Sequence, residues 1–92
     1  MAVTVKLPTQ LRAAVGGVSS VEAAGATVGE VLDSVYDQHP ELRDRIADEG
    51  GDLRRFVNVY VGGEDIRFLD GLETAVDDGG EVQILPAVAG GD

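Results

Sequence analysis

The C-terminal end of the sequence is the first place where residue type and spacing suggest a chemical role. Residues 82–91 are ten consecutive uncharged residues, and they end in Gly90-Gly91 before the acidic Asp92. Glycine has no Cβ, so this end is narrow enough to pass through a channel in another protein. An uncharged segment also avoids the cost of moving a side-chain charge into such a channel. The pattern predicts a chain end that is presented to a partner's active site.

Position distinguishes this glycine doublet from the others. The four earlier doublets lie between predicted elements and are interpreted as turns: Gly16-Gly17, Gly50-Gly51, Gly62-Gly63 and Gly79-Gly80. Gly90-Gly91 follows a predicted strand and Pro86, and no later element needs a turn. Fully extended, Ala87, Val88, Ala89, Gly90 and Gly91 would reach on the order of 16 Å beyond Pro86. The alternative is a frayed terminus without a function.

The remaining side chains offer little chemistry. The sequence has no cysteine and therefore no thiolate nucleophile, disulfide or zinc knuckle. His39 is the only histidine, and its place before Pro40 is typical of a solvent-facing helix end. Glu64-Asp65 and Asp77-Asp78 adjoin glycine turns without the spaced ligands of a calcium loop. We therefore predict neither a catalytic residue nor a metal site.

Charge and length limit the classes of function. Seventeen acidic and seven basic residues give a net charge of -10, which repels nucleic acids and anionic membranes. No long apolar run or secretion signal is recognised in the 92 residues, so we expect a cytoplasmic protein. Arg54-Arg55 is interpreted as strand-end charge that discourages edge pairing. The alternative is that this pair steers an acidic partner.

The elements that would carry the end of the chain begin with a predicted hairpin. Residues 2–7 alternate with Val3, Val5 and Leu7 on one side, as in a half-buried strand. Residues 9–17 are interpreted as a loop or short turn, and residues 18–23 as a second, weaker strand.

A helix is predicted next, with Thr27 and Glu30 as a capping box. Its apolar face consists of Val28, Val31, Leu32, Val35 and Tyr36. Pro40 ends this helix and can begin a short second one with Leu42 and Ile46 directed inward.

Three further strands are predicted in the second half. Residues 53–61 form the strongest, with Val57, Val59 and Val61 facing the core. Gly62-Gly63 suits a hairpin to a strand over residues 64–69 in which Ile66 and Phe68 are aligned. Asp70 is predicted to cap a short turn carrying Leu72 and Val76, and residues 81–85 form the last strand, with Val82 and Ile84 inward.

This order predicts an α+β protein in which a mixed sheet packs on one principal helix, and a β-grasp arrangement satisfies it. We expect residues 1–86 to form the domain and residues 87–92 a flexible C-terminal tail. Strand alternation places Phe56, Tyr60 and Leu85 opposite the core residues, where they are predicted to form a partner surface. The alternative is that the second helix or the tail covers them.

Four segments, which together span nearly the whole chain, are similar to one known family: VTVKLPTQLR at 3–12, LRAAVGG at 11–17, FVNVYVGGEDIRF at 56–68 and LETAVDDGGEVQILPAVAGG at 72–91. They resemble the ubiquitin-like sulfur carriers, which include the molybdopterin synthase small subunit MoaD and the thiamine-pathway carrier ThiS, and within these the carriers for cysteine synthesis. The resemblance implies a β-grasp fold. It also implies that Gly91 is adenylated and converted to a thiocarboxylate.

The same resemblance implies the partners. An adenylating and sulfurtransferase enzyme of the ubiquitin-activating type would supply ATP and Mg²⁺, while the carrier itself binds no cofactor. A pyridoxal-phosphate-dependent cysteine synthase would accept the sulfur, and a metallopeptidase would trim the tail. The chain would therefore be a sulfur donor and a substrate of enzymes, not an enzyme.

Asp92 departs from the family pattern because Gly91 has no free carboxylate while Asp92 remains. We predict that a peptidase removes Asp92; the alternatives are a cloning remnant or a deliberate block. Three other functions stay open. These are a ubiquitin-like modifier of lysines, a carrier for thiamine, molybdopterin or secondary-metabolite synthesis, and a noncovalent interaction module.

Overall fold

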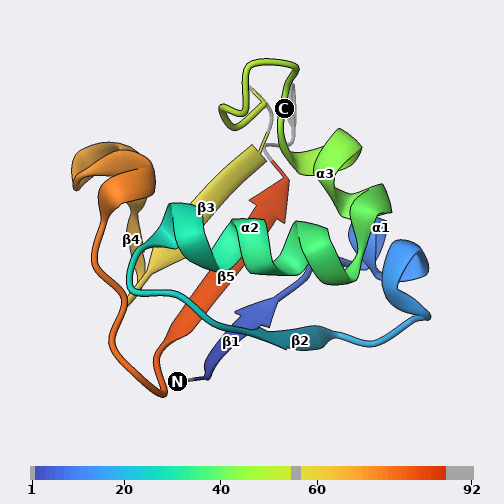
Figure 1. Cartoon of the computed structure of the whole chain (residues 1–92), viewed down its shortest axis with the longest axis horizontal. Helices are drawn as coiled ribbons and strands as arrows, with labels where there is room; N and C mark the ends of the chain where they lie inside the picture. Colours follow the sequence, from blue (N-terminus) through green and yellow to red (C-terminus); the bar gives the residue numbers. More distant parts are fainter. Residues whose placement is uncertain (1, 55–56, 87–92) are drawn as a thin grey trace.

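A five-stranded mixed sheet packed against one long helix organises the protein (Figure 1). The computed structural model describes residues 2–54 and 57–86. The strand order is β2-β1-β5-β3-β4, and the strands are β1 (Val3–Lys6), β2 (Ser20–Ala23), β3 (Val57–Val61), β4 (Glu64–Asp65) and β5 (Glu81–Pro86). β5 runs parallel to β1 and antiparallel to β3, while β1 also pairs antiparallel with β2. The predicted hairpin and the mixed sheet on one principal helix are confirmed.

Helix α2 (Val28–Gln38) crosses one face of the sheet (Figure 1), and its first turn is capped by side chains. The Glu30 backbone N–H donates to Thr27 Oγ1 at 3.3 Å. The Glu30 carboxylate accepts from the backbone N–H of Ala26 at 3.0 Å, one residue before the partner that a capping box requires. Both side chains still satisfy backbone N–H groups that the helix leaves free.

Pro40 is the first residue of helix α3 (Pro40–Ile46), which follows α2 directly. The fixed φ of proline suits this position, where no intrahelical donor is needed. Leu42 and Ile46 are buried, as the sequence predicts.

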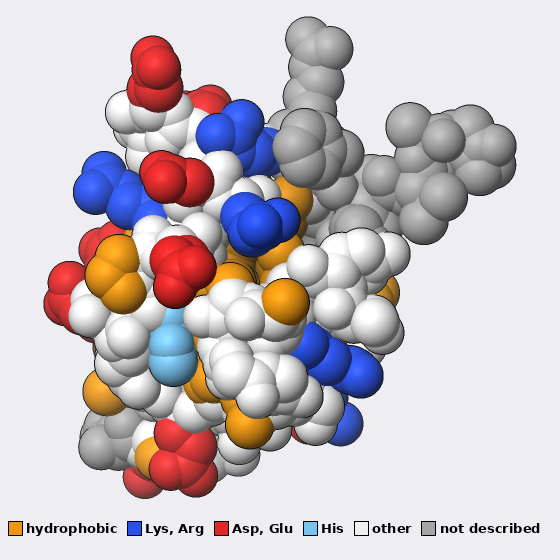
Figure 2. Space-filling view, turned by 90° about the vertical axis from the view of Figure 1, so that its right-hand side faces the viewer, with side chains coloured by type: hydrophobic (Ala, Val, Ile, Leu, Met, Phe, Trp, Pro, Cys, Tyr) orange, Lys and Arg blue, Asp and Glu red, His pale blue; other side chains and the backbone are white. Residues whose placement is uncertain are grey.

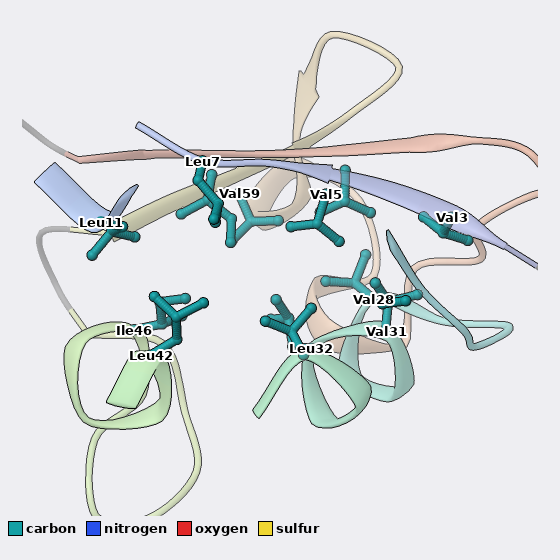
Figure 3. Close-up of a cluster of buried hydrophobic side chains, with 14 of the residues drawn as sticks. Val3, Val5, Leu7, Leu11, Val28, Val31, Leu32, Leu42, Ile46 and Val59 are labelled. Atoms are coloured by element: carbon teal, nitrogen blue, oxygen red, sulfur yellow. The ribbon is translucent and has the colours of Figure 1, made fainter. Parts of the chain in front are cut away.

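The core lies between the sheet and the helices. Figure 3 shows Val3, Val5 and Val59 of the sheet, with Leu7 directly after β1, facing Val28, Val31 and Leu32 of α2, while Leu11, Leu42 and Ile46 close one end. These valines and leucines follow a period of two on the strands and 3.6 on the helix, so each element buries one face. Val82 and Ile84 of β5 are also buried. β5 is therefore held by its pairing with β1 and β3 and by the packing of its inner face against the core.

Residues 9–17, predicted as a loop or short turn, are helical over most of their length. Helix α1 (Thr9–Arg12) and the 3-10 helix η1 (Ala13–Val15) precede the turn at Gly16-Gly17. Leu11 and Val15 lie four residues apart and are both buried, so one side of these short turns packs on the core. Two apolar residues were too short a pattern to indicate a helix.

The predicted strand over residues 64–69 is also wrong beyond its first two residues. The Asp65 side chain accepts from the Arg67 backbone N–H at 2.8 Å and starts the 3-10 helix η2 (Ile66–Phe68). This turn rotates successive side chains by about a third of a circle, so Ile66 is buried while Phe68 is 85% exposed. Arg67 reaches the part of β3 that β4 does not pair with, donating to the Asn58 side chain and the Val57 carbonyl.

The 3-10 helix η3 (Gly71–Glu73) follows, but the Asp70 side chain does not cap it, contrary to the prediction. Instead, the Asp70 backbone N–H donates to Thr74 Oγ1 at 3.1 Å. Leu72 packs against the core and Val76 is buried, as expected. Within the two described ranges, no helix has the length and apolar character that crossing a membrane requires.

Candidate functional site

The strand that leads to the C-terminal end is the central strand of the sheet. β5 lies between β1 and β3, and Pro86, its last residue, is in register with Val57. The predicted tail begins at the next residue. Its predicted site residues Ala87, Val88, Ala89, Gly90, Gly91 and Asp92 lie outside the described residues. The structure therefore gives the position from which the tail departs.

Two hollows flank the end of β5. The first, here called the Val57 hollow, has a volume of about 380 Å³ and is lined by Pro8, Gln10, Leu11, Asp44, Arg45, Arg54 and Val57. The second, the Gln83 hollow, has a volume of about 350 Å³ and is lined by Lys6, Leu7, Pro8, Thr9, Gln10, Arg12, Gln83, Ile84 and Leu85. Pro8 and Gln10 line both, so the start of α1 lies between them. This end of the sheet is indented on two sides.

Basic side chains collect at this end. Figure 2 shows Lys and Arg side chains on one face around a region where hydrophobic side chains are visible, with Asp and Glu side chains among them. Arg12 donates from Nε to the Leu7 carbonyl at 3.2 Å, and Arg54 donates from Nε to the Asp44 carbonyl at 2.8 Å. Lys6 Nζ lies 3.5 Å from Glu81 Oε2, with both side chains about half exposed. That is the one ion pair within 4 Å among residues 2–54 and 57–86.

Two of the three residues predicted as a partner surface lie on the outer face of the sheet. Tyr60 and Leu85 are half-buried, and they alternate with the buried Val59 and Ile84. The register pairs Tyr60 with Gln83 and Asn58 with Leu85, so Tyr60 and Leu85 are diagonal neighbours on adjacent strands. Phe56 lies outside the described residues. A docking role for these residues stays a prediction.

Two other titratable residues, His39 and Tyr36, lie where they contribute to the packing and connection of the helices. His39 joins α2 to α3, and its backbone N–H donates to the Val35 carbonyl at 2.8 Å. Burial, followed by the nearby charge of Asp33, raises the pKa of Tyr36 to about 12, while Arg43 opposes the shift. Tyr36 therefore stays protonated near neutral pH. In the part of the chain that the structure describes, no three His, Cys, Asp or Glu side chains gather to hold a metal ion.

Of the three arginines that lie around the end of β5, only one stands out in the sequence. Arg54 is interpreted there as strand-end charge, with the steering of an acidic partner as the alternative. Arg12 and Arg45 reach the same region from α1 and α3, which are far apart in the sequence. Only the fold brings these three arginines together.

Comparisons with known proteins agree with this geometry. Residues 5–91 match the ThiS family. The chain is 50% identical to the sulfur carrier protein CysO of Mycobacterium tuberculosis over 93 residues, covering 99% of this chain and all of that protein. It is 44% identical to small archaeal modifier protein 3 of Haloferax volcanii over 66 residues, covering 72% of this chain and 71% of that protein.

A solved structure gives the same fold. A chain of the crystal structure of the Amycolatopsis orientalis BexX/CysO complex superposes with a TM-score of 0.88 at 54% identity, covering 97% of this chain and 99% of that one. The relatives named CysO are sulfur carrier proteins. The chain belongs to the ThiS family of sulfur carriers and has their ubiquitin-like β-grasp fold.

Proposed function

We propose that this protein carries sulfur as a thiocarboxylate on Gly91, after removal of Asp92, and that the sulfur is used to make cysteine. The observation that carries the proposal is the similarity to CysO over the full length of both chains. The sequence supports it, because an uncharged segment with a Gly90-Gly91 end follows the central strand β5.

The proposed chemistry has two steps. A Gly91 carboxylate oxygen attacks the α-phosphorus of ATP, which releases pyrophosphate and forms an acyl-adenylate. Sulfide sulfur from a donor then attacks the acyl carbon and expels AMP, which leaves the thiocarboxylate. The carrier contributes the electrophile, and the adenylating enzyme contributes the nucleotide site, Mg²⁺ and the sulfur donor. The absence of cysteine from the chain fits this division of roles.

The position of β5 supports presentation of Gly91 to another protein. Pro86 is held in register with Val57, so the folded domain stays outside a partner while the next five residues extend on the order of 16 Å from it. A CysO has been crystallised in a complex with BexX. By analogy, we expect an adenylating enzyme, a sulfur-accepting synthase and a tail-trimming metallopeptidase as partners of this chain.

The test is intact-mass analysis of the protein purified from its native cell. We expect loss of one aspartate residue and then replacement of one oxygen by sulfur at the new C-terminus. Gly91→Val should abolish sulfur loading, because a branched side chain would obstruct a narrow channel. Gly50→Ala is the control, since a Cβ at Gly50 would meet only an ordinary 3.5 Å contact with Asp48. Sulfur loading with Asp92 still attached would refute the processing step.

A role as a protein modifier is the second candidate, favoured by the 44% identity to a small archaeal modifier protein. Both functions use the same activated terminus. Lysine-linked conjugates of this chain would support modification, whereas transfer of labelled sulfur into cysteine supports carriage. Labelled sulfur in thiamine, molybdopterin or a secondary metabolite would assign the carrier to that pathway instead of cysteine synthesis. Full function after deletion of residues 90–92 would leave only a noncovalent module.

A further inference from the structure

Three arginines around the end of β5 form no ion pairs with the protein's own carboxylates among the described residues. The chain has seventeen acidic residues, yet Arg12, Arg45 and Arg54 have no carboxylate within 4 Å among the described residues. Asp44 lines the Val57 hollow with Arg45 and Arg54, but it forms no such contact either. The charged groups of these three arginines are therefore available to anions outside the domain.

Two of these side chains are held by the backbone. The Nε groups of Arg12 and Arg54 donate to the carbonyls of Leu7 and Asp44, which fixes one edge of each guanidinium. Neither terminal nitrogen is used by these bonds, so the edge that suits a two-pronged carboxylate contact stays unused by them. A guanidinium oriented in advance loses less side-chain entropy when it binds a carboxylate.

The same arginines line the two hollows near the end of the strand that leads to the tail. Arg12 lines the Gln83 hollow together with residues of β1 and β5. Arg45 and Arg54 line the Val57 hollow together with α1 residues and Val57, which is in register with Pro86. Anything that encloses the chain beyond Pro86 must meet this arginine-bearing end of the domain.

We propose that Arg12, Arg45 and Arg54 dock onto carboxylates at the entrance of the channel through which the adenylating enzyme receives the tail. This inference rests on the proposed function. It explains how an enzyme surface that carries carboxylates can bind a carrier of net charge -10. The charged residues that line the two hollows at the contact are mainly basic.

Distance favours protein carboxylates over the phosphates of ATP as the anions. The reacting carboxyl group of Gly91 lies on the order of 16 Å beyond Pro86 when the tail is extended. The arginines lie at the base of the tail, beside residues of β5 and β3. A nucleotide at Gly91 is then beyond the reach of an arginine side chain, while the rim of the channel is adjacent to it.

The experiment uses a chain that ends at Gly91 and the adenylating enzyme from the same cell. Pyrophosphate exchange is measured against carrier concentration at low and moderate salt. We expect Arg12→Ala, Arg45→Ala and Arg54→Ala each to raise KM about three- to tenfold with kcat unchanged, and to weaken the dependence of KM on salt. Contacts at the base of the tail are made equally before and during the reaction, so kcat is spared.

Ala24→Asp is the matched control, because it lowers the net charge by one unit, as each arginine variant does. Ala24 is exposed and follows Ala23, which pairs with Val3 at the opposite end of β1 from Lys6. Its KM should equal that of the wild type. Arg45 forms no side-chain hydrogen bond within the described ranges, so Arg45→Ala is informative even where Arg12→Ala or Arg54→Ala impairs folding.

Four outcomes would overturn the proposed dock. Unchanged KM in the arginine variants, or an equal rise in Ala24→Asp, would show that these side chains make no specific contact. A fall in kcat at unchanged KM would place the arginines at the nucleotide. Absence of exchange with the wild-type chain would instead refute the proposed function, and with it the dock.

Discussion

The two ends of β5 differ in charge although they belong to one six-residue strand. At its start, Glu81 follows the turn that contains Asp77 and Asp78, and Asp78 accepts from the Ala2 backbone N–H at 3.2 Å. At its end, Arg12 and Arg54 line the flanking hollows. Acidic side chains thus accompany the entry into the strand, and basic side chains its exit.

This difference shows that net charge does not describe the surface that a partner meets. At physiological ionic strength, charges are screened over about 8 Å, so a protein surface responds mainly to the charges nearest to it. Among the residues that the structure describes, four basic residues and one acidic residue line the two hollows near the end of β5. The remaining acidic residues still favour solubility of the whole molecule.

The largest predicted effect is a loss of stability when the core packing in the middle of β5 is removed. Ile84 is 1% exposed in the middle of β5, and Ile84→Ala should lower the free energy of unfolding by about 3 kcal/mol, through lost burial and a residual cavity. Denaturant unfolding followed by circular dichroism measures this. Gln83→Ala, on the exposed face of the same strand, should change stability by less than about 0.5 kcal/mol. Equal losses in the two variants would contradict the inward placement of Ile84.

A smaller effect tests whether the start of α2, which lies away from the end of β5, affects stability without affecting the KM for adenylation. Thr27→Ala removes the acceptor for the Glu30 N–H and should cost about 1 kcal/mol of unfolding free energy. The KM for adenylation should stay unchanged, because Thr27 lies at the far end of α2 from α3. Thr27→Ser keeps the acceptor and serves as the control. If the serine variant loses as much stability as the alanine variant, the hydrogen bond is not the cause.

The smallest effect concerns the ion pair between Lys6 of β1 and Glu81 at the start of β5. Lys6 lines the Gln83 hollow, and its partner Glu81 begins β5. Because both side chains are about half exposed, a double-mutant cycle of Lys6→Ala and Glu81→Ala should give a coupling energy below about 0.5 kcal/mol, decreasing with salt. A coupling above about 1 kcal/mol that resists salt would indicate a buried network instead.

Periodicity in the sequence was enough to predict the elements that carry many apolar residues. The valines of β1 and β3 alternate, and the apolar residues of α2 recur at helical spacing, so both patterns extend over several residues. Shorter patterns failed. α1 and η1 bury only Leu11 and Val15, and the alternation of Ile66 and Phe68 could not reveal that the Asp65 side chain starts a turn.

The candidate site divides in the same way. The glycine doublet Gly90-Gly91 is a local motif that is visible in the sequence alone. It lies outside the described residues, so its role stays a prediction. The arginines at the base of the tail come from three separate segments, and their convergence depends on the packing of α1 and α3 beside β5. No local pattern encodes such convergence, because it is a property of the tertiary fold.

The placement of β5 between two neighbours also determines how the domain bears a pull on its C-terminal end. Hydrogen bonds to β1 on one side and to β3 on the other run across the strand. Tension along the chain at Pro86 therefore loads both rows of bonds in shear at the same time, and no single row can open one bond after another. A force applied to the chain after Pro86 is resisted by both neighbours of β5 together.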